Sequence, residues 1–355
     1  MNKVKFGIIG TGAVAEKHAA ALAEVPNAEL IMVYDNIPER ARQFAAKYHC
    51  HAAMSFDELL LSPADAVTIA TPSGLHAEVA IPAACAGKHI LCEKPLEVTP
   101  DKADKLIRAC ASSKVKLSTV FQSRFSRAVK AIRKAIDAGR FGQPVLASAS
   151  IRWYRTPEYY AASGWRGTWA LDGGGALMNQ GIHTVDLLLY FNGDVAEVNG
   201  YATRRLHRGI EVEDTTVAML KFRNDSLGTI EASTACAPGF PRRIELSGTL
   251  GSVTLEDDRI TRWQFLDEQP EDGEIRRDHL AGEGLNGGSG DPGAISCEGH
   301  RRQLQELTDA ILNDTDLSLS GTEGKRSVEL ICTIYESART GAAVRFAVIP
   351  KSWTT

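Results

Sequence analysis

The sequence predicts two domains of different construction: an α/β domain with a doubly wound parallel sheet, then an α+β domain with an open, mostly antiparallel sheet. Three observations carry this prediction. The length of 355 residues corresponds to two or three domains of about 150 residues each. Short apolar runs alternate with helical patterns over roughly the first 120 residues. After that, strand-like runs follow one another with a single helical segment among them.

The composition is that of an ordinary globular protein. Hydrophobic residues make up 44% and charged residues 24%, which excludes a disordered or collagen-like chain. The formal net charge of −4 argues against a partner such as nucleic acid or a membrane surface, because both need a cationic face. No apolar run reaches the ~18 residues of a membrane-spanning helix. The seven cysteines form no CxxC pair, so we expect reduced thiols and a cytoplasmic location.

The first domain is predicted to cover residues 1–122. Its short, continuous apolar runs suit strands that are buried on both faces. Ser55 and Glu58 read as a helix capping box, and Thr99 reads as an N-cap before Pro100. We expect strands at 4–9, 29–34, 66–70, 89–92 and 115–120, with helices at 13–25, 38–48, 75–86 and 100–113.

The second domain is predicted to cover residues 123–355, beginning with a helix at 124–138. Its strands are expected at 145–153, 195–203, 215–222, 228–234, 243–247, 251–255 and 259–265, with one helix at about 174–190. The polar, glycine-rich stretch 266–294 predicts a long surface loop. Two amphipathic helices, near 297–313 and 322–340, close the chain, and an arrangement in which they pack back on the first domain is left open.

The turn after the first strand predicts a dinucleotide site. Gly10-Thr11-Gly12-Ala13-Val14-Ala15 opens the first helix and fits the GxGxxG/A fingerprint of a Rossmann domain. Its glycines permit a tight turn and let the backbone approach a pyrophosphate, which the helix N-terminus attracts. The predicted cofactor contacts in this turn are Gly10, Thr11, Gly12, Ala13 and Val14.

An acid at the end of the second strand bears on the choice of cofactor. Asp35 stands 35 − 12 = 23 residues after Gly12, near the ~20-residue offset of a ribose-binding carboxylate. A carboxylate there accepts a hydrogen bond from the ribose 2′-hydroxyl and repels a 2′-phosphate, so NAD is expected over NADP. Asn36 is placed in the same site. In the alternative interpretation, Asp35 caps the helix that begins at Pro38.

Polar residues also follow two more predicted strands of the first domain. Thr71-Pro72-Ser73-Gly74-Leu75-His76 follows the strand at 66–70, and Glu93-Lys94-Pro95 follows the strand at 89–92. Ligands bind at the carboxyl ends of the strands in an open α/β sheet, so both segments are expected to border the cofactor. The predicted cofactor contacts in them are Thr71, Pro72, His76, Glu93 and Lys94.

Lys94 is the candidate for proton transfer. Pro95 biases Lys94 away from the helical region and permits a cis peptide bond, which fixes where the ammonium group points. A lysine partly removed from water beside a positively charged nicotinamide gives up its proton more readily, as acid–base catalysis requires. By itself Glu-Lys-Pro is an ordinary exposed turn, but its place at a strand end of this sheet favours a catalytic role.

Together with a glycine run and a following histidine, Gly173-Gly174-Gly175…His183-Thr184-Val185-Asp186, these motifs resemble the glucose–fructose oxidoreductase / inositol dehydrogenase / rhizopine catabolism (Gfo/Idh/MocA) family. The resemblance covers nearly the whole chain. It implies that Lys94 and His183 are catalytic and that the substrate is a small carbohydrate. It also implies a second domain whose exposed sheet face forms a homodimer or homotetramer.

The chain departs from the family pattern at one position. Many members carry an aspartate four residues before the histidine, where this sequence has Asn179. A neutral amide can orient His183 but cannot stabilise its imidazolium as a carboxylate would. Asn179 looks like the variant of family members that oxidise nucleotide-linked sugar acids. The predicted substrate contacts therefore include Lys94, Asn179 and His183.

A segment dense in aromatics and arginines precedes the glycine run. Aromatic faces pack against sugar rings, and arginine binds carboxylate or phosphate through two parallel hydrogen bonds. By resemblance, Trp165 and Arg166 lie against the cofactor, and Arg152 and Tyr160 lie nearer the substrate. In the alternative interpretation this segment is an aromatic cluster of the core or of an interface.

The predicted function is hydride transfer between NAD and a secondary hydroxyl of a sugar, sugar acid, nucleotide sugar or cyclitol. Two alternatives stay open on the same scaffold: an NAD-binding regulator without turnover, and a glycosidase that recycles its NAD. No metal is expected, because His49-Cys50-His51 has no partner cluster in the sequence and adjacent ligands cannot close a tetrahedral site alone.

Overall fold

The computed structural model describes residues 3–280 and 297–347, which divide into two compact units. Unit 1 comprises Met1–Phe125, Thr168–Gly173 and Ser296–Val328. Unit 2 comprises Ser126–Gly167, Gly174–Ile295 and Glu329–Thr355. The chain therefore leaves the first unit close to the expected boundary after residue 122 but returns to it twice.

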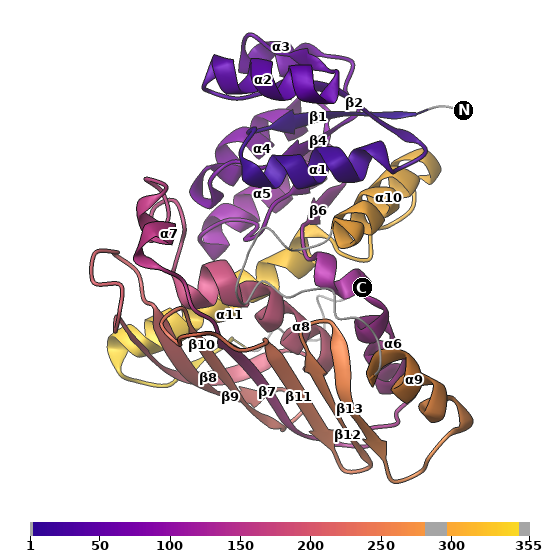
Figure 1. Cartoon of the computed structure of the whole chain (residues 1–355), viewed down its shortest axis with the longest axis vertical. Helices are drawn as coiled ribbons and strands as arrows, with labels where there is room; N and C mark the ends of the chain where they lie inside the picture. Colours follow the sequence, from indigo (N-terminus) through magenta and orange to yellow (C-terminus); the bar gives the residue numbers. More distant parts are fainter. Residues whose placement is uncertain (1–2, 281–296, 348–355) are drawn as a thin grey trace. The chain divides into compact units, whose positions relative to one another are not determined.

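Unit 1 is built on a six-stranded, wholly parallel sheet of order β3-β2-β1-β4-β5-β6 (Figure 1). The strands are β1 (Val4–Ile9), β2 (Ala28–Tyr34), β3 (His51–Ala52), β4 (Ala66–Ile69), β5 (His89–Cys92) and β6 (Leu117–Thr119). The helices are α1 (Ala13–Ala23), α2 (Pro38–Tyr48), α3 (Phe56–Leu61), α4 (His76–Cys85), α5 (Pro100–Ser112) and α10 (Glu298–Asn313). This order confirms the predicted doubly wound Rossmann sheet.

Two apolar clusters cover the two faces of this sheet. The first joins β1 to α1 and α10, with Leu22, Leu304 and Leu307 buried among its residues. The second packs α4 and α5 against β4 and β5. The expected caps are present: the Ser55 side chain accepts from the Glu58 N–H, and that of Thr99 from the Lys102 N–H.

Unit 2 is built on an eight-stranded sheet of order β13-β12-β11-β7-β10-β9-β8-β14. Within the described part of this second sheet, β7·β10 is the only parallel pair. The strands are β7 (Pro144–Arg152), β8 (Val195–Thr203), β9 (Thr215–Phe222), β10 (Leu227–Ser233), β11 (Arg243–Gly248), β12 (Gly251–Glu256), β13 (Arg259–Phe265) and β14 (Val344–Arg345). The prediction of an open, mostly antiparallel sheet is confirmed.

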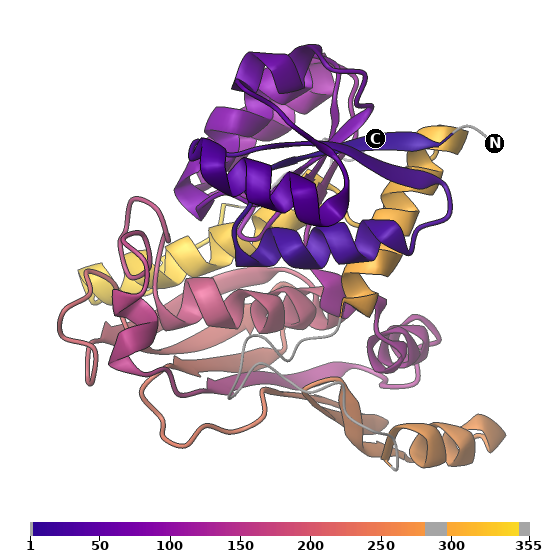
Figure 2. The same ribbon diagram turned by 45° about the horizontal axis from the view of Figure 1, so that its top comes forward.

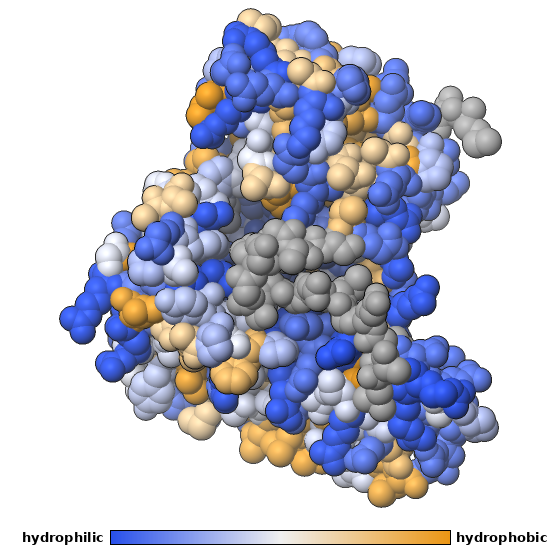
Figure 3. Space-filling view, in the orientation of Figure 1, coloured by the Kyte–Doolittle hydropathy of each residue, from blue (hydrophilic) through white to orange (hydrophobic). Residues whose placement is uncertain are grey.

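Helices cover one face of this second sheet. They are α8 (Ile182–Asn192) and the part of α11 (Gly321–Thr340) that belongs to unit 2; Figure 2 shows both above the strands. The opposite face carries exposed apolar side chains on four adjacent strands: Leu146, Leu227, Val217, Met219 and Tyr201. The surface seen in Figure 3 is mostly hydrophilic, with scattered apolar patches.

The predicted loop at 266–294 is wrong in its first half, which forms helix α9 (Pro270–Leu280). The sequence of α9 shows no helical periodicity, and contacts with residues of other elements stabilise the helix instead. The Asp272 carboxylate accepts hydrogen bonds from Trp263 Nε1 at 2.6 Å and from Arg140 at 2.5 and 2.7 Å. These bonds anchor the first turn of α9 to β13 and to the chain after α6 (Arg127–Asp137). Residues 281–294 of the predicted loop lie outside the described residues.

The helix expected at 174–190 has two different parts. A π-helix, η3 (Ala176–Gly181), leads directly into α8. A short helix, α7 (Pro157–Ala161), precedes it in the aromatic segment. All seven cysteines lie in the described residues and are free thiols. Over 3–280 and 297–347, no helix is long and apolar enough to cross a membrane.

Candidate functional site

The glycine turn of unit 1 leaves the backbone open at the start of α1. Gly10 has φ +90°, and a Cβ there would lie 2.8 Å from the Ala70 carbonyl oxygen, so only glycine fits. Gly12 is the N-cap of α1 and, as a glycine, makes no side-chain cap hydrogen bond. A Cβ on Gly12 would meet no described atom within 4 Å. The first N–H groups of α1 therefore offer an open anion site, as a pyrophosphate requires.

Asp35 is held by the glycine turn itself. Its Oδ2 accepts from the Thr11 N–H at 2.8 Å and from the Thr11 hydroxyl at 2.9 Å. Its Oδ1 accepts from the Ile37 N–H at 2.9 Å, at the N-cap of α2. The Asp35 carboxylate thus joins the ends of β1 and β2, and it also accepts a hydrogen bond from the backbone at the start of α2. Asn36 is exposed beside it.

The turn after β4 lies beside the glycine turn, because β4 pairs with β1 in the sheet. This is the switch point of strand order, where doubly wound sheets bind their ligands. Thr71 Oγ1 is buried with no hydrogen-bond partner within the described part of the chain. A buried hydroxyl of this kind, next to an open helix N-terminus, fits a bound dinucleotide. Pro72 follows it and is half-buried.

His76 connects the turn after β4 to the turn after β5. Its ring is fully buried, with Nδ1 2.8 Å from the Pro95 carbonyl oxygen and Nε2 3.1 Å from that of Thr71. Burial lowers the pKa of His76. His76 thus joins the two turns that contain Thr71 and Lys94, and its contact with the cofactor stays a prediction. The sequence reasoning missed Glu97, which is also buried and accepts from the Ala77 N–H at 3.0 Å.

Glu93 is buried between two histidines that the sequence reasoning missed. Its Oε1 lies 2.8 Å from His18 Nε2, on α1, and 3.7 Å from His300 Nε2, on α10. Burial alone would raise the pKa of Glu93, but hydrogen bonds from His18 and His300 outweigh it and hold the pKa well below the usual value. The two rings therefore hold the Glu93 carboxylate, and its contact with the cofactor stays a prediction.

His18, Glu93 and His300 are residue types that bind metals, and their possible ligand atoms lie within 4.8 Å of one another. Histidines that bind metals normally donate their second ring N–H to an acceptor. Here Nδ1 of both rings has no hydrogen-bond partner in residues 3–280 and 297–347. The geometry therefore favours a hydrogen-bonded triad.

Lys94 lies at the carboxyl end of β5 and is half-buried. Its N–H donates to Glu93 Oε2 at 3.1 Å, and its peptide bond to Pro95 is cis. The backbone of the predicted catalytic lysine is thus fixed by the same carboxylate that the two histidines hold. Its role in catalysis stays a prediction.

Asn179 and His183 lie on consecutive helices of unit 2. Asn179 is in the π-helix η3, and His183 is in the first turn of α8. Both are half-buried, whereas Gln180, Gly181 and Ile182 between them are buried. The amide and the imidazole are therefore the accessible polar groups of this stretch.

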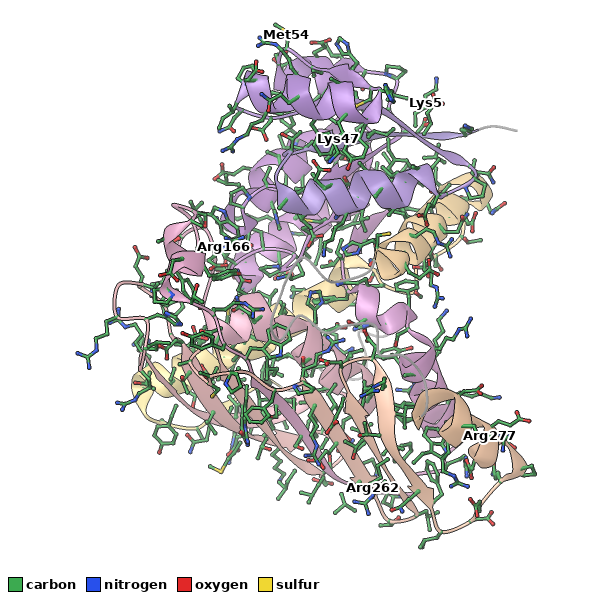
Figure 4. All side chains as sticks on the ribbon, in the orientation of Figure 1. Lys5, Lys47, Met54, Arg166, Arg262 and Arg277 are labelled. Carbon is green, nitrogen blue, oxygen red and sulfur yellow. The ribbon has the colours of Figure 1, made fainter. Side chains whose placement is uncertain are left out.

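An arginine–aromatic cluster adjoins the π-helix. The guanidinium carbons of Arg155 and Arg166 lie 5.6 and 4.4 Å from the centre of the Tyr159 ring. Arg166 also lies over Trp165, at 5.4 Å, and Figure 4 labels it beside α7. The Tyr159 hydroxyl accepts from Gln180 Nε2 at 3.1 Å. This bond joins the cluster to the helix that carries Asn179.

Two predicted substrate contacts are not supported. Arg152 lies on β7 between Ile151 and Trp153, both buried on the helix-covered face, so its side chain lies on the opposite face. There it pairs with Glu231 on β10, at 2.8 and 2.5 Å. Tyr160 is buried, and its hydroxyl shares a 2.9 Å hydrogen bond with Thr234. For Tyr160 the alternative of a core aromatic cluster fits the structure.

Comparison with known proteins agrees with this architecture. Residues 4–121 match the model described as oxidoreductase family, NAD-binding Rossmann fold, and residues 129–254 match the Gfo/Idh/MocA C-terminal domain. The chain belongs to the Gfo/Idh/MocA family. The predicted family and the predicted NAD-binding oxidoreductase are thereby confirmed.

Several members of the Gfo/Idh/MocA family are similar over most of the chain. The crystal structure of the WlbA dehydrogenase from Bordetella pertussis, in complex with NADH and UDP-GlcNAcA, is 32% identical with a TM-score of 0.88. That comparison covers 98% of this chain and 99% of the other. Myo-inositol 2-dehydrogenase from Thermotoga maritima is 29% identical over 76% of this chain and 80% of its own. Levoglucosan dehydrogenase from Pseudarthrobacter phenanthrenivorans is 29% identical over 73% and 75%.

Proposed function

We propose that this protein is an NAD-dependent dehydrogenase that oxidises a secondary hydroxyl of a nucleotide-linked sugar acid. The observation that carries the proposal is the likeness to the WlbA dehydrogenase, which extends over 98% of this chain and whose crystal structure holds NADH and UDP-GlcNAcA. A levoglucosan dehydrogenase structure also covers 98% of this chain, but at 25% identity and a TM-score of 0.84, against 32% and 0.88 for the WlbA dehydrogenase.

The residues of unit 2 support an anionic substrate. Arg155 and Arg166 are clustered around Tyr159, and the Tyr159 hydroxyl bonds to the residue next to Asn179. A guanidinium group binds a carboxylate through two parallel hydrogen bonds, and an aromatic ring packs on a sugar face. Asn179 supports the same substrate class by family resemblance.

The residues of unit 1 support NAD as the cofactor. The open N-terminus of α1 would hold the pyrophosphate, and Thr71 would bond to the cofactor through its buried hydroxyl. Asp35 would accept from the ribose 2′-hydroxyl and repel a 2′-phosphate. Trp165 and Arg166 stay candidates for contact with the cofactor.

The chemistry divides between the cofactor and two side chains. NAD⁺, when bound, supplies the hydride acceptor. Lys94, as the neutral amine, would take the proton of the substrate hydroxyl while the substrate carbon gives up its hydride, so that the hydroxyl becomes a ketone and Lys94 an ammonium group. His183 would share this proton transfer, and Asn179 would orient the His183 ring.

The direct experiment is an NADH absorbance assay with purified protein, NAD and a panel of UDP-GlcNAcA, myo-inositol and levoglucosan. Net NADH formation with UDP-GlcNAcA is the expected result. Tight NAD binding without turnover of any substrate would favour the regulator, and sugar cleavage without net NADH would favour the glycosidase. Turnover of myo-inositol alone would favour the cyclitol dehydrogenase that the Thermotoga relative suggests.

The open face of the second sheet supports a homo-oligomer. The exposed apolar side chains on β7–β10 would be covered by a second copy of the chain, as a homodimer or homotetramer. Met219→Lys, in the middle of this face, should shift the mass measured by light scattering towards the monomer. An unchanged mass would contradict this arrangement. The cytoplasmic location stays a prediction.

A further inference from the structure

The N-terminus of the π-helix is closed by one buried acid. Glu213 Oε2 accepts from the Gly175 N–H at 2.6 Å, and Glu213 Oε1 accepts from the Leu177 N–H at 2.8 Å. The backbone carbonyl of Glu213 accepts from the Ala176 N–H at 3.2 Å. The first N–H groups of a helix have no partner within the helix. Here the N–H groups of residues 175–177 are all bonded to Glu213, which lies 38 residues after Gly175.

Tyr335, on α11, completes this arrangement. Its hydroxyl donates to Glu213 Oε1 at 3.0 Å, and it also hydrogen-bonds to the backbone of Met178. Glu213 is only 4% exposed. The donors of residues 175–178 are therefore all bonded to Glu213 or Tyr335, both of which reach this site from other elements of unit 2.

The glycine run makes this close approach possible. A Cβ on Gly175 would lie 1.6 Å from the Glu213 carbonyl oxygen, and one on Gly174 would lie 2.4 Å from the Tyr335 hydroxyl. Neither distance is compatible with a side chain. The glycines are thus explained by contact with the Glu213–Tyr335 pair.

We infer that Glu213 and Tyr335 are positioning residues, which hold the π-helix in register so that Asn179 and His183 face the substrate. A π-turn is an uncommon conformation that persists where surrounding contacts hold it, and it is often found at functional sites. Here the pair bonds the first turn of the π-helix, and Asn179 and His183 follow directly. The catalytic part of this inference rests on the proposed dehydrogenase function.

Two conservative variants test the inference. Tyr335→Phe removes one hydroxyl, and Glu213→Gln replaces one acceptor oxygen by an amide NH₂ that cannot accept. Ser337→Ala is the control, because Ser337 is also on α11 and its buried hydroxyl bonds to Gly200 and Ala342, away from the π-helix. Equal melting temperatures of Tyr335→Phe and Ser337→Ala would show that both variants are folded.

The first measurement needs no substrate. Hydrogen–deuterium exchange of peptides that span 174–186 should be faster in both variants than in the wild type and in Ser337→Ala. The imidazole NMR signal of His183, assigned by its loss in His183→Gln, should also shift in both variants only. Unchanged exchange together with an unchanged His183 signal would overturn the inference, whatever reaction the protein catalyses.

The second measurement tests the effect on the reaction. In Tyr335→Phe, kcat for NADH formation should fall at least tenfold, while the dissociation constant of NAD stays unchanged. A substrate deuterated at the reacting carbon should then show a larger isotope effect, because poorer alignment slows hydride transfer. Faster exchange with full kcat would overturn the positioning role. Absence of turnover in the wild type would instead refute the proposed function and leave the exchange result to decide the structural part.

Discussion

Thr11 donates two hydrogen bonds to the same carboxylate oxygen of Asp35, from its N–H at 2.8 Å and from its hydroxyl at 2.9 Å. The turn at the end of β1 and the acid at the end of β2 are therefore one structural feature. Its parts are local to a βαβ unit, which is why the sequence pattern could predict both.

This relationship predicts the cofactor preference. The Asp35 carboxylate would repel a 2′-phosphate, so NAD should bind at least tenfold more tightly than NADP, a difference of about 1.4 kcal/mol. Asp35→Ser should reduce that ratio, with Glu39→Ser, an exposed acid in the first turn of α2, as the control. Calorimetry gives both dissociation constants, and equal values in the wild type would contradict the assignment of Asp35.

Lys94 is predicted to act in the chemical step. Lys94→Ala should leave the dissociation constant of NAD nearly unchanged and lower kcat by roughly 10²–10⁴-fold, the usual range for loss of a general acid or base. Lys102→Ala, which removes another lysine of unit 1, is the control. A Lys94→Ala enzyme with wild-type turnover would show that the Glu-Lys-Pro turn is structural.

The arginines are predicted to divide between two ligands. Arg155→Gln should lower kcat/KM for UDP-GlcNAcA about tenfold or more, because a charge-assisted hydrogen bond contributes about 1.5–3 kcal/mol. Arg166→Gln should weaken NAD binding instead. Arg152→Gln should change neither, since Arg152 pairs with Glu231 on the other sheet face. If only Arg152→Gln affected the acid substrate, the placement of the site on the helix-covered face would be refuted.

The buried histidine of α10 predicts a pH dependence of stability. Burial lowers the pKa of His300 below the 6.5 of an unfolded chain. As the pH falls below 6.5 the unfolded chain takes up a proton that the folded state resists, so the free energy of unfolding decreases. His300→Asn should make this decrease shallower between about pH 7.5 and 5.5 in urea unfolding, by at most ~1.4 kcal/mol per pH unit.

Two other groups bear on the interpretation of that measurement. Burial raises the pKa of Glu213 to about 7, so its contribution has the opposite sign and is lost as the pH rises through 7. Glu213 is present in the wild type and in His300→Asn, so its contribution cancels when their two pH dependences are compared. His51→Asn is the control, because His51 is exposed beside Glu58. If the free energy of unfolding changed with pH equally in His300→Asn and in the wild type, the lowered pKa of His300 would be contradicted.

The sequence predicted those parts of the fold and site that local patterns encode. Gly10 and Asp35 belong to one short motif, and apolar runs marked the strands. The His18–Glu93–His300 triad joins α1, β5 and α10, and no periodicity relates residues so far apart in the chain. Helix α9 depends on the bonds of Asp272 to Arg140 and Trp263, so its polar sequence read as a loop.

The proposed substrate is a sugar acid linked to a nucleotide, and a single pair of rates tests this directly. UDP-GlcNAcA and UDP-GlcNAc carry the same nucleotide diphosphate and differ only in the sugar, which bears a carboxylate in the first and an uncharged hydroxymethyl group in the second. With saturating NAD, kcat/KM should be at least about tenfold higher for UDP-GlcNAcA, which corresponds to about 1.4 kcal/mol of discrimination through the arginine cluster. Equal values of kcat/KM, or a preference for UDP-GlcNAc, would contradict the account.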